Sequence, residues 1–140
     1  ADALARHALV VAGDGDTELL SCGPLLPGCT VRIDPPGAAI GEIVVTAPFL
    51  FDGYHRQHDR TAEVLAGGAY RTRDLGFVHA GELFVLGRLD DLLICNGRNH
   101  LAHEVEHVAA QVDGVKAGRG VALGLPSAER GTDDIWLVQE

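Results

Sequence analysis

Residues 70–77 read Tyr-Arg-Thr-Arg-Asp-Leu-Gly-Phe, and three further runs of glycine, arginine and acidic residues follow them closely. These runs are Gly81-Glu82-Leu83-Phe84, Gly87-Arg88-Leu89-Asp90-Asp91 and Asn96-Gly97-Arg98-Asn99-His100. Charged residues and glycines that interrupt short apolar runs are typical of strand ends and turns. Carboxylates and guanidinium groups at such places can hold a nucleotide, so this ordered set is the strongest signal for both the fold and the site.

The composition limits the classes of protein to which the chain can belong. It has 140 residues, 46% of them hydrophobic, which suits one modest core or two small ones. Its formal charge is −9 and Lys116 is its single lysine, so we expect no nucleic acid partner, because binding phosphate backbones requires clustered cations. No apolar run approaches the roughly 20 residues that cross a bilayer, and the N-terminus lacks a leader pattern. We therefore expect no membrane span and a cytoplasmic location.

The three cysteines point to neither a disulfide framework nor a zinc site. Cys22, Cys29 and Cys95 are odd in number and have no C-x-x-C spacing. Buried reduced thiols are the expected state.

The first two thirds of the chain favour strands joined by turns, because Gly, Pro and Asp separate short apolar runs. We predict strands at 18–21, 29–33, 42–46, 70–72 and 83–86, and a short helix at 61–65. Gly67-Gly68 is placed to end that helix.

The pattern changes after Arg88. A strand is predicted at 92–95, where Asn96-Gly97 favours a tight hairpin turn. A helix is predicted at 102–112, with one apolar stripe facing the core; the stripe is Leu101, Val105, Val108 and Val112. Two more strands are predicted at 120–125 and 135–138. The fold class is therefore α+β, a β-rich segment followed by a small α/β unit, with the division near Leu89-Asp90.

Two residues in the first segment are candidates for nucleotide contacts. Asp74 follows a predicted strand, and its carboxylate can either accept two hydrogen bonds from ribose hydroxyls or cap a turn. Arg88 also ends a strand, and its planar fork can either pair with phosphate or ribose oxygens or form a surface ion pair. Spacing alone leaves both alternatives open.

A third alternative comes from residues 103–107, which match the H-E-x-x-H pattern of zinc hydrolases. In that pattern His103 and His107 would bind the metal from one helix face. A third protein ligand is needed, and the extended motif would place Gly and His where this chain has Ala110 and Asp113.

Taken together, the motifs resemble the adenylate-forming (AMP-forming acyl-activating) ligase superfamily, and within it the fatty-acyl-AMP ligases. The family's usual run is close to Y-R-T-G-D-L-G-F, then D-G-E-L-F-I-T-G-R-I-K-D-L-I-I, then G-R-N-H-Y-P-Q-D-I-E; here it stands at 70–77, 80–94 and 97–106. Residues 21–28, 41–54 and 121–140 are similar to further motifs of the family, so the resemblance covers nearly the whole chain in order.

The resemblance implies where the chain belongs in a larger enzyme. Residues 1–89 would form the β-rich end of the large N-terminal domain, and residues 90–140 the start of the small mobile C-terminal domain. Asp74 would bind the ribose hydroxyls of ATP, Arg88 would assist at ribose or phosphate, and Asp90 would lie on the hinge between domains. Gly97 and Arg98 would lie on the loop that approaches the pantetheine tunnel during acyl transfer. No catalytic residue or metal ligand is assigned within the chain.

The implied reaction joins a fatty acid to ATP, giving acyl-AMP and pyrophosphate, and then passes the acyl group to the phosphopantetheine of an acyl carrier protein. ATP or AMP with Mg²⁺ is the implied cofactor. The implied partners are the fatty acid, the carrier protein and the remainder of the ligase. The family's P-loop-like motif, acyl pocket and late catalytic lysine have no counterpart here. We therefore expect the chain alone to be inactive.

One departure supports a different class of function. Arg73 stands where the family has the Gly of T-G-D, and arginine would strain the turn if that position has a positive φ. The chain is then expected to be a non-catalytic binding or assembly module that has lost nucleotide binding.

Overall fold

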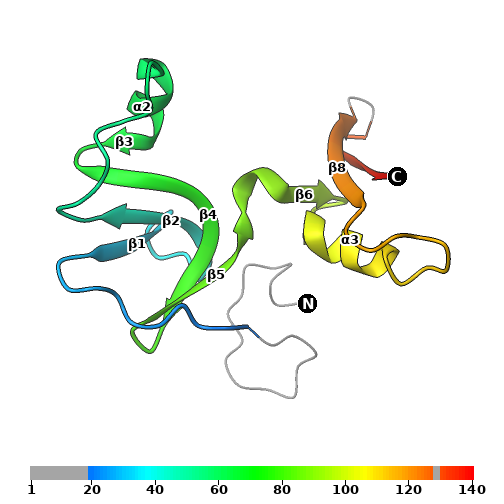
Figure 1. The fold of residues 1–140 in the computed structure, drawn as a ribbon, viewed down its shortest axis with the longest axis horizontal. Helices are drawn as coiled ribbons and strands as arrows, with labels where there is room; N and C mark the ends of the chain where they lie inside the picture. Colours follow the sequence, from blue (N-terminus) through cyan, green and yellow to red (C-terminus); the bar gives the residue numbers. More distant parts are fainter. Residues whose placement is uncertain (1–18, 128–129) are drawn as a thin grey trace. The chain divides into compact units, whose positions relative to one another are not determined.

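The computed structural model describes residues 19–127 and 130–140, which form strands, short helices and turns in an α+β arrangement (Figure 1). These residues divide into two compact units, one ending at Leu89 and the other beginning at Asp90. The predicted fold class is confirmed. The assignment of the two units to particular domains of a larger enzyme stays a prediction.

The first unit is an antiparallel sheet of five strands with one short helix. Its elements are β1 (Thr30–Asp34), β2 (Gly41–Thr46), α2 (His58–Val64), β3 (Leu65–Ala66), β4 (Ala69–His79) and β5 (Glu82–Arg88). The strand β4 is central, because β2 pairs with one of its edges while β3 and β5 share the other. Buried apolar side chains form its core: Ile40, Ile43, Val44, Val64, Leu75, Phe77 and Leu86.

Most strands of this unit lie where the sequence predicts them, but two differ. Residue 18 lies outside the described residues, and 19–21 form no strand. The next residues instead join the sheet by two backbone hydrogen bonds, Cys22 N–H to Leu83 O at 2.8 Å and Leu83 N–H to Gly23 O at 3.1 Å. The strand predicted at 70–72 extends over 69–79, because its polar residues 72–74 form a bulge and not a turn.

The second unit consists of a 3-10 turn η1 (Leu89–Asp91), two hairpins and a helix. The first hairpin pairs β6 (Leu92–Cys95) with β7 (Arg98–Leu101) through a turn in which Asn96 and Gly97 have φ of 51° and 70°. The second pairs β8 (Gly120–Ser127) with β9 (Thr132–Gln139). The predicted strand at 92–95 and the Asn-Gly turn are confirmed.

The helix α3 (Ala102–Ala109) is shorter than predicted, and fewer of its side chains are buried than the predicted stripe requires. Leu93, Ala102 and Ala122 form that core, with Val105 and Ile135 packed against it. The predicted buried stripe is wrong at Val108 and Val112, which are 65% and 60% exposed. Val112 lies beyond the helix end, and the two-stranded hairpin beneath α3 leaves Val108 without cover. No helix in the described ranges is long and apolar enough to cross a membrane.

Candidate functional site

Asp74 and Arg88 lie directly opposite each other on β4 and β5. Arg88 Nη1 donates to Asp74 Oδ1 at 2.9 Å, and the two side chains are 50% and 34% exposed. The ion-pair alternative for Arg88 therefore holds, with Asp74 as a partner. A carboxylate has about four acceptor positions, so Asp74 keeps acceptor capacity for ligand hydroxyls while it is paired.

Asp74 lies at a wide irregularity in the pairing of β2 with β4. Val44 pairs with Arg71 and Glu42 pairs with Leu75, so Ile43 alone faces residues 72–74 of β4. The hydroxyl of Thr72 bridges this bulge: it donates to Ile43 O at 2.9 Å and accepts the Asp74 N–H at 3.0 Å. The Asp74 N–H is thus bound by a side chain and not by the backbone of β2, while Asp74 pairs with Arg88 on the other edge of β4.

Arg73 sits in the bulge with a φ of 61°. The left-handed region costs a non-glycine residue roughly 1–2 kcal/mol, which is why glycine is favoured there. The strain expected from arginine at this position is therefore present. Its N–H donates to Glu42 Oε1 at 3.1 Å.

Acidic and basic side chains behind the bulge form a connected network. Arg71 Nη2 donates to Asp34 Oδ2 at 2.8 Å and also to Glu42 Oε2, and Arg32 donates to the other oxygen of Asp34. The hydrogen bond from Arg71, followed by that from Arg32, lowers the pKa of Asp34 below its ordinary value. The bond to Asp34 likewise raises the pKa of Arg71. Glu42 is buried, and Arg71 supplies the countercharge that a buried carboxylate needs.

An aromatic cluster lies at the start of β4. Phe51 packs against Tyr54 and Tyr70 with ring centroids 5.2 and 5.1 Å apart, and the guanidinium of Arg60 lies 4.7 Å from the Tyr54 centroid. A hydrogen bond with Tyr54 raises the pKa of Tyr70, and desolvation and the charge of Asp74 act in the same direction. This cluster was not predicted from the sequence. The signal for the cluster in the sequence was the spacing of aromatic residues around Gly53. Gly53 itself has little room for a side chain, because an added Cβ would meet the Thr61 side chain at 2.6 Å.

The other predicted site residues belong to the second unit. Asp90 lies in η1, Gly97 is the second residue of the β6–β7 turn, and Arg98 begins β7. All three are exposed. Their roles at a hinge and in a transfer-state loop stay predictions.

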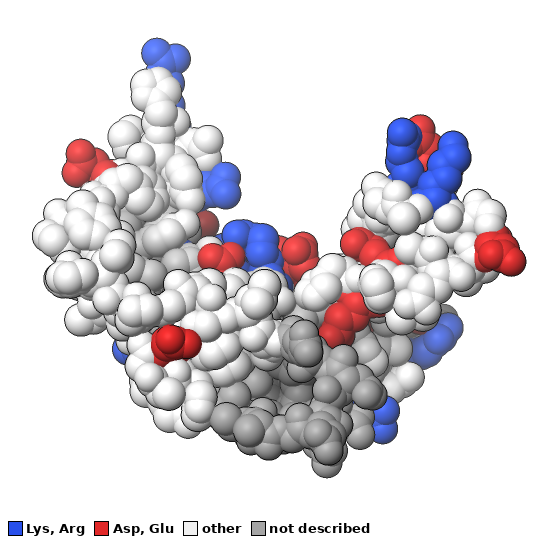
Figure 2. Space-filling view, turned by 60° about the horizontal axis from the view of Figure 1, so that its bottom comes forward, with Lys and Arg blue, Asp and Glu red and all other residues white. Residues whose placement is uncertain are grey.

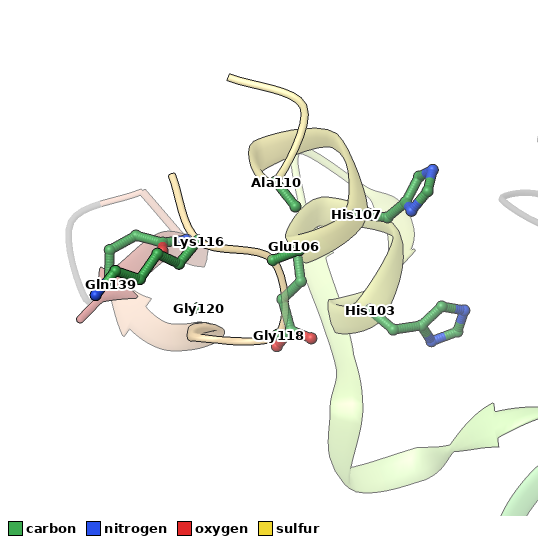
Figure 3. A pocket seen from close by; sticks show the side chains of 9 residues that line it. His103, Glu106, His107, Ala110, Lys116, Gly118, Gly120 and Gln139 are labelled. Atoms are coloured by element: carbon green, nitrogen blue, oxygen red, sulfur yellow. The ribbon is translucent and has the colours of Figure 1, made fainter. Parts of the chain in front are cut away.

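The zinc alternative gains no support from the second unit. Figure 3 shows His103 and His107 projecting from one side of α3, while Glu106 points from another side toward the start of β8. Glu106 Oε1 accepts the Ala122 N–H at 2.9 Å, which gives this carboxylate a structural role beside a cavity of about 230 Å³. Within the described part of the chain, no group of three or more His, Cys, Asp or Glu side chains can hold a metal ion.

Charged side chains on the face in Figure 2 occur in small groups of both signs. Basic side chains do not gather into one broad patch on the described part of that face. A polyanion would therefore meet carboxylates beside the cations there.

The chain matches no family model, but it is similar to known ligases. It is 32% identical to the medium-chain-fatty-acid–[acyl-carrier-protein] ligase JamA of Moorena producens, in a match that covers 100% of this chain and 27% of JamA. It is 36% identical to the long-chain-fatty-acid–AMP ligase FadD26 of Mycobacterium tuberculosis, over 81% of this chain and 22% of FadD26. The chain thus spans about a quarter of the length of these relatives.

Solved structures give the same result for the fold. One comes from a study of fatty acyl-adenylate ligases from E. coli and L. pneumophila; it superposes with a TM-score of 0.75 at 29% identity, over 97% of this chain and 26% of that one. These matches correspond to the C-terminal parts of adenylate-forming enzymes.

Proposed function

Because the chain belongs to the adenylate-forming ligase superfamily, we propose that it works as the C-terminal portion of a fatty-acyl-AMP ligase. Residues 1–89 then complete the large domain and residues 90–140 begin the small mobile domain. The division of the described residues between Leu89 and Asp90 supports this assignment and the hinge role of Asp90. The exposed turn at Gly97 and Arg98 supports their place in the transfer-state loop. The cytoplasm is the proposed location.

The proposed reaction has two steps. A fatty acid carboxylate attacks the α-phosphorus of ATP, which forms acyl-AMP and releases pyrophosphate, with Mg²⁺ accompanying the ATP. The thiol of a carrier protein's phosphopantetheine then attacks the acyl carbon, which forms a thioester and releases AMP. The names of JamA and FadD26 support a fatty acid as substrate.

The observation that carries the proposal is the Asp74–Arg88 pair at the bulge. The Asp74 carboxylate accepts hydrogen bonds from the ribose hydroxyls, which fixes the nucleotide relative to the sheet. Arg88 neutralises that carboxylate and donates to ribose or phosphate oxygens through its remaining N–H groups. Both residues therefore act by binding and orientation, and the chemistry at phosphorus belongs to the rest of the ligase.

Nucleotide binding tests this proposal. The chain is joined to the N-terminal portion of a ligase of the family, and its affinity for ATP and for a non-hydrolysable acyl-adenylate analogue is measured by calorimetry. Asp74→Ala should weaken both ligands by roughly tenfold or more, as expected for loss of hydrogen bonds to a charged acceptor. Asp113→Ala removes an equal charge from an exposed turn and should leave affinity unchanged. Equal affinities for the Asp74→Ala and unaltered proteins would contradict the proposal.

Activity of the chain by itself is a separate test. We propose that the 140-residue chain does not release pyrophosphate, because the P-loop-like motif and acyl pocket lie outside it. Fatty-acid-dependent pyrophosphate release by the purified chain would overturn this.

A second candidate function is favoured by Arg73. Its strained φ at a glycine position of the family motif is consistent with a non-catalytic binding or assembly module. In that case the joined protein binds no ATP. The assembly role would not depend on nucleotide binding, so Arg73→Gly does not need to restore ATP binding. ATP binding that depends on Asp74 excludes this candidate.

A further inference from the structure

We propose that Glu42 is a positioning residue that holds the bulge of β4 in the conformation that presents Asp74 to the nucleotide. The inference rests on the function proposed for Asp74. It assigns to a buried carboxylate on a neighbouring strand the task of fixing that site.

Glu42 contacts two separate groups of β4. Glu42 lies on β2 with 6% of its surface exposed, and its two oxygens accept from two parts of β4. Oε1 accepts the Arg73 N–H at 3.1 Å, and Oε2 accepts from the Arg71 guanidinium. One carboxylate therefore holds the backbone of the residue before Asp74 as well as the strand that leads into the bulge.

The bulge depends on such a contact. Residues 72–74 have no ladder partner on β2 other than the region of Ile43. The Arg73 N–H would lose its acceptor without Glu42, and the positive φ of Arg73 is unfavourable by itself. A strained residue persists only when its surroundings fix it. Glu42 and the Thr72 hydroxyl both provide such contacts to the backbone of the bulge.

Asp34 distinguishes this role of Glu42 from general ion pairing. Arg71 also binds Asp34, on β1, and Asp34 accepts its hydrogen bonds from the side chains of Arg71 and Arg32. Removing Asp34 therefore perturbs the Arg71 network but not the contact to Arg73. Asp34 supplies the matched control for Glu42.

The experiment compares variants at these two positions. Glu42→Met keeps the side-chain length without an acceptor, Glu42→Gln keeps an acceptor oxygen for Arg73, and Asp34→Asn is the control. In the 140-residue chain, amide hydrogen exchange by NMR reports whether the Arg73 and Asp74 N–H groups are protected. In the joined ligase, calorimetry reports affinity for AMP.

We expect Glu42→Met to lose protection and AMP affinity at the bulge alone, and Glu42→Gln to keep both. Glu42→Met should accelerate exchange at Arg73 and Asp74 and weaken AMP binding by roughly tenfold, while exchange at Phe77 and Leu86 stays slow. Glu42→Gln and Asp34→Asn should keep protection and affinity within about threefold of the unaltered protein. A role limited to overall stability would instead raise exchange throughout the sheet.

Every other outcome also decides whether Glu42 holds the bulge. Unchanged protection or unchanged AMP affinity in a folded Glu42→Met protein overturns the inference. If Glu42→Met does not fold, Glu42→Asp replaces it, because aspartate keeps the charge near Arg71 but withdraws the acceptor from Arg73; the same results are then required of it. If the unaltered ligase binds no AMP, or Asp74→Ala has no effect on affinity, the proposed function fails, and hydrogen exchange alone decides whether Glu42 holds the bulge.

Discussion

Asp74 faces Arg88 because β5 contains one residue more than a regular ladder would use. From the turn at residues 80 and 81, the register runs from His79↔Glu82 to Gly76↔Val85 and then continues as Leu75↔Gly87 and Asp74↔Arg88. Leu86 is the extra residue and is buried. Without this shift Asp74 would face Gly87, which has no side chain to pair with a carboxylate. The ion pair of the candidate site is thus a product of a β-bulge.

Replacing Arg88 should separate its binding role from its structural role. Arg88→Ala removes a pair whose members are 50% and 34% exposed, so the free energy of unfolding should fall by only about 0–1 kcal/mol. Nucleotide affinity in the joined ligase should fall by about tenfold or more, because the cation that neutralises Asp74 and the ligand is lost. Urea unfolding and calorimetry measure the two effects.

Arg119→Ala, which breaks the exposed pair with Glu140, is the control and should leave affinity unaltered. A large stability loss with unaltered affinity would assign Arg88 to structure alone.

Glycine at position 73 should relieve backbone strain. Arg73 has a φ of 61°, which costs an L-residue roughly 1–2 kcal/mol, while glycine loses about 0.4–1 kcal/mol more conformational entropy on folding. Arg73→Gly should therefore raise the free energy of unfolding by up to about 1 kcal/mol, measured from the urea midpoint.

The control for Arg73→Gly is Arg98→Gly. Arg98 is an exposed strand residue without a positive φ, so this change should lower stability. The same sign of change at both positions would rule out strain at Arg73 as the cause.

The sequence predicts those features of the fold that depend on local patterns. The strand β6, with its apolar run and Asn96-Gly97 turn, is predicted at its observed bounds. The strand β7 is missed, because Arg98, Asn99 and His100 have no apolar alternation and are held by pairing with β6. The helix α3 is predicted too long because its apolar stripe continues beyond the part that the hairpin of β8 and β9 covers.

The sequence predicts which residues belong to the candidate site, but not how these residues contact one another. Asp74 and Arg88 are identified from motif order, but their pairing depends on two ladder irregularities that no local pattern reveals. Glu42 is part of a recognisable motif, yet its contact with Arg73 joins residues 31 positions apart. Such contacts follow from the register of non-adjacent strands, which a single sequence specifies weakly.

An alanine at position 76 should destabilise the first unit. A Cβ on Gly76 would lie 2.3 Å from the Phe84 carbonyl oxygen and 2.6 Å from Ile43 Cδ1, and the carbonyl belongs to a paired strand that cannot move away freely. Gly76→Ala should lower the free energy of unfolding by about 1–3 kcal/mol. Gly124→Ala is the control, since its nearest neighbours are side-chain atoms at 3.2 Å that can shift. Equal losses in thermal or urea unfolding would contradict the steric explanation.

The network around Asp34 should make stability depend on pH in the acid range. Hydrogen bonds from Arg71 and Arg32 hold the pKa of Asp34 below its ordinary value of 3.8. The stabilisation is therefore complete above that ordinary value and is lost as the pH falls through the lower folded-state pKa. Asp34→Asn should be less stable than the unaltered chain near neutral pH, and the difference should vanish in strong acid. Urea unfolding at several pH values measures it; a difference that persists unchanged in strong acid would assign the effect to packing.

The Tyr54–Tyr70 contact gives a prediction at the opposite end of the pH scale. The hydrogen bond with Tyr54, then desolvation, raise the pKa of Tyr70 above its ordinary value of 10.0. The unfolded chain therefore loses this proton first as the pH rises, so the contribution of Tyr70 to stability is present below its unfolded-state pKa and decreases above it. Tyr54→Phe removes the hydrogen bond but keeps the ring beside Phe51, and should bring the pKa of Tyr70 back toward its ordinary value. With only two tyrosines in the chain, tyrosinate absorbance follows Tyr70 alone in this variant. The complementary variant Tyr70→Phe reports Tyr54 in the same way, and an unchanged Tyr70 titration in Tyr54→Phe would leave desolvation and the charge of Asp74 as the causes of the raised pKa.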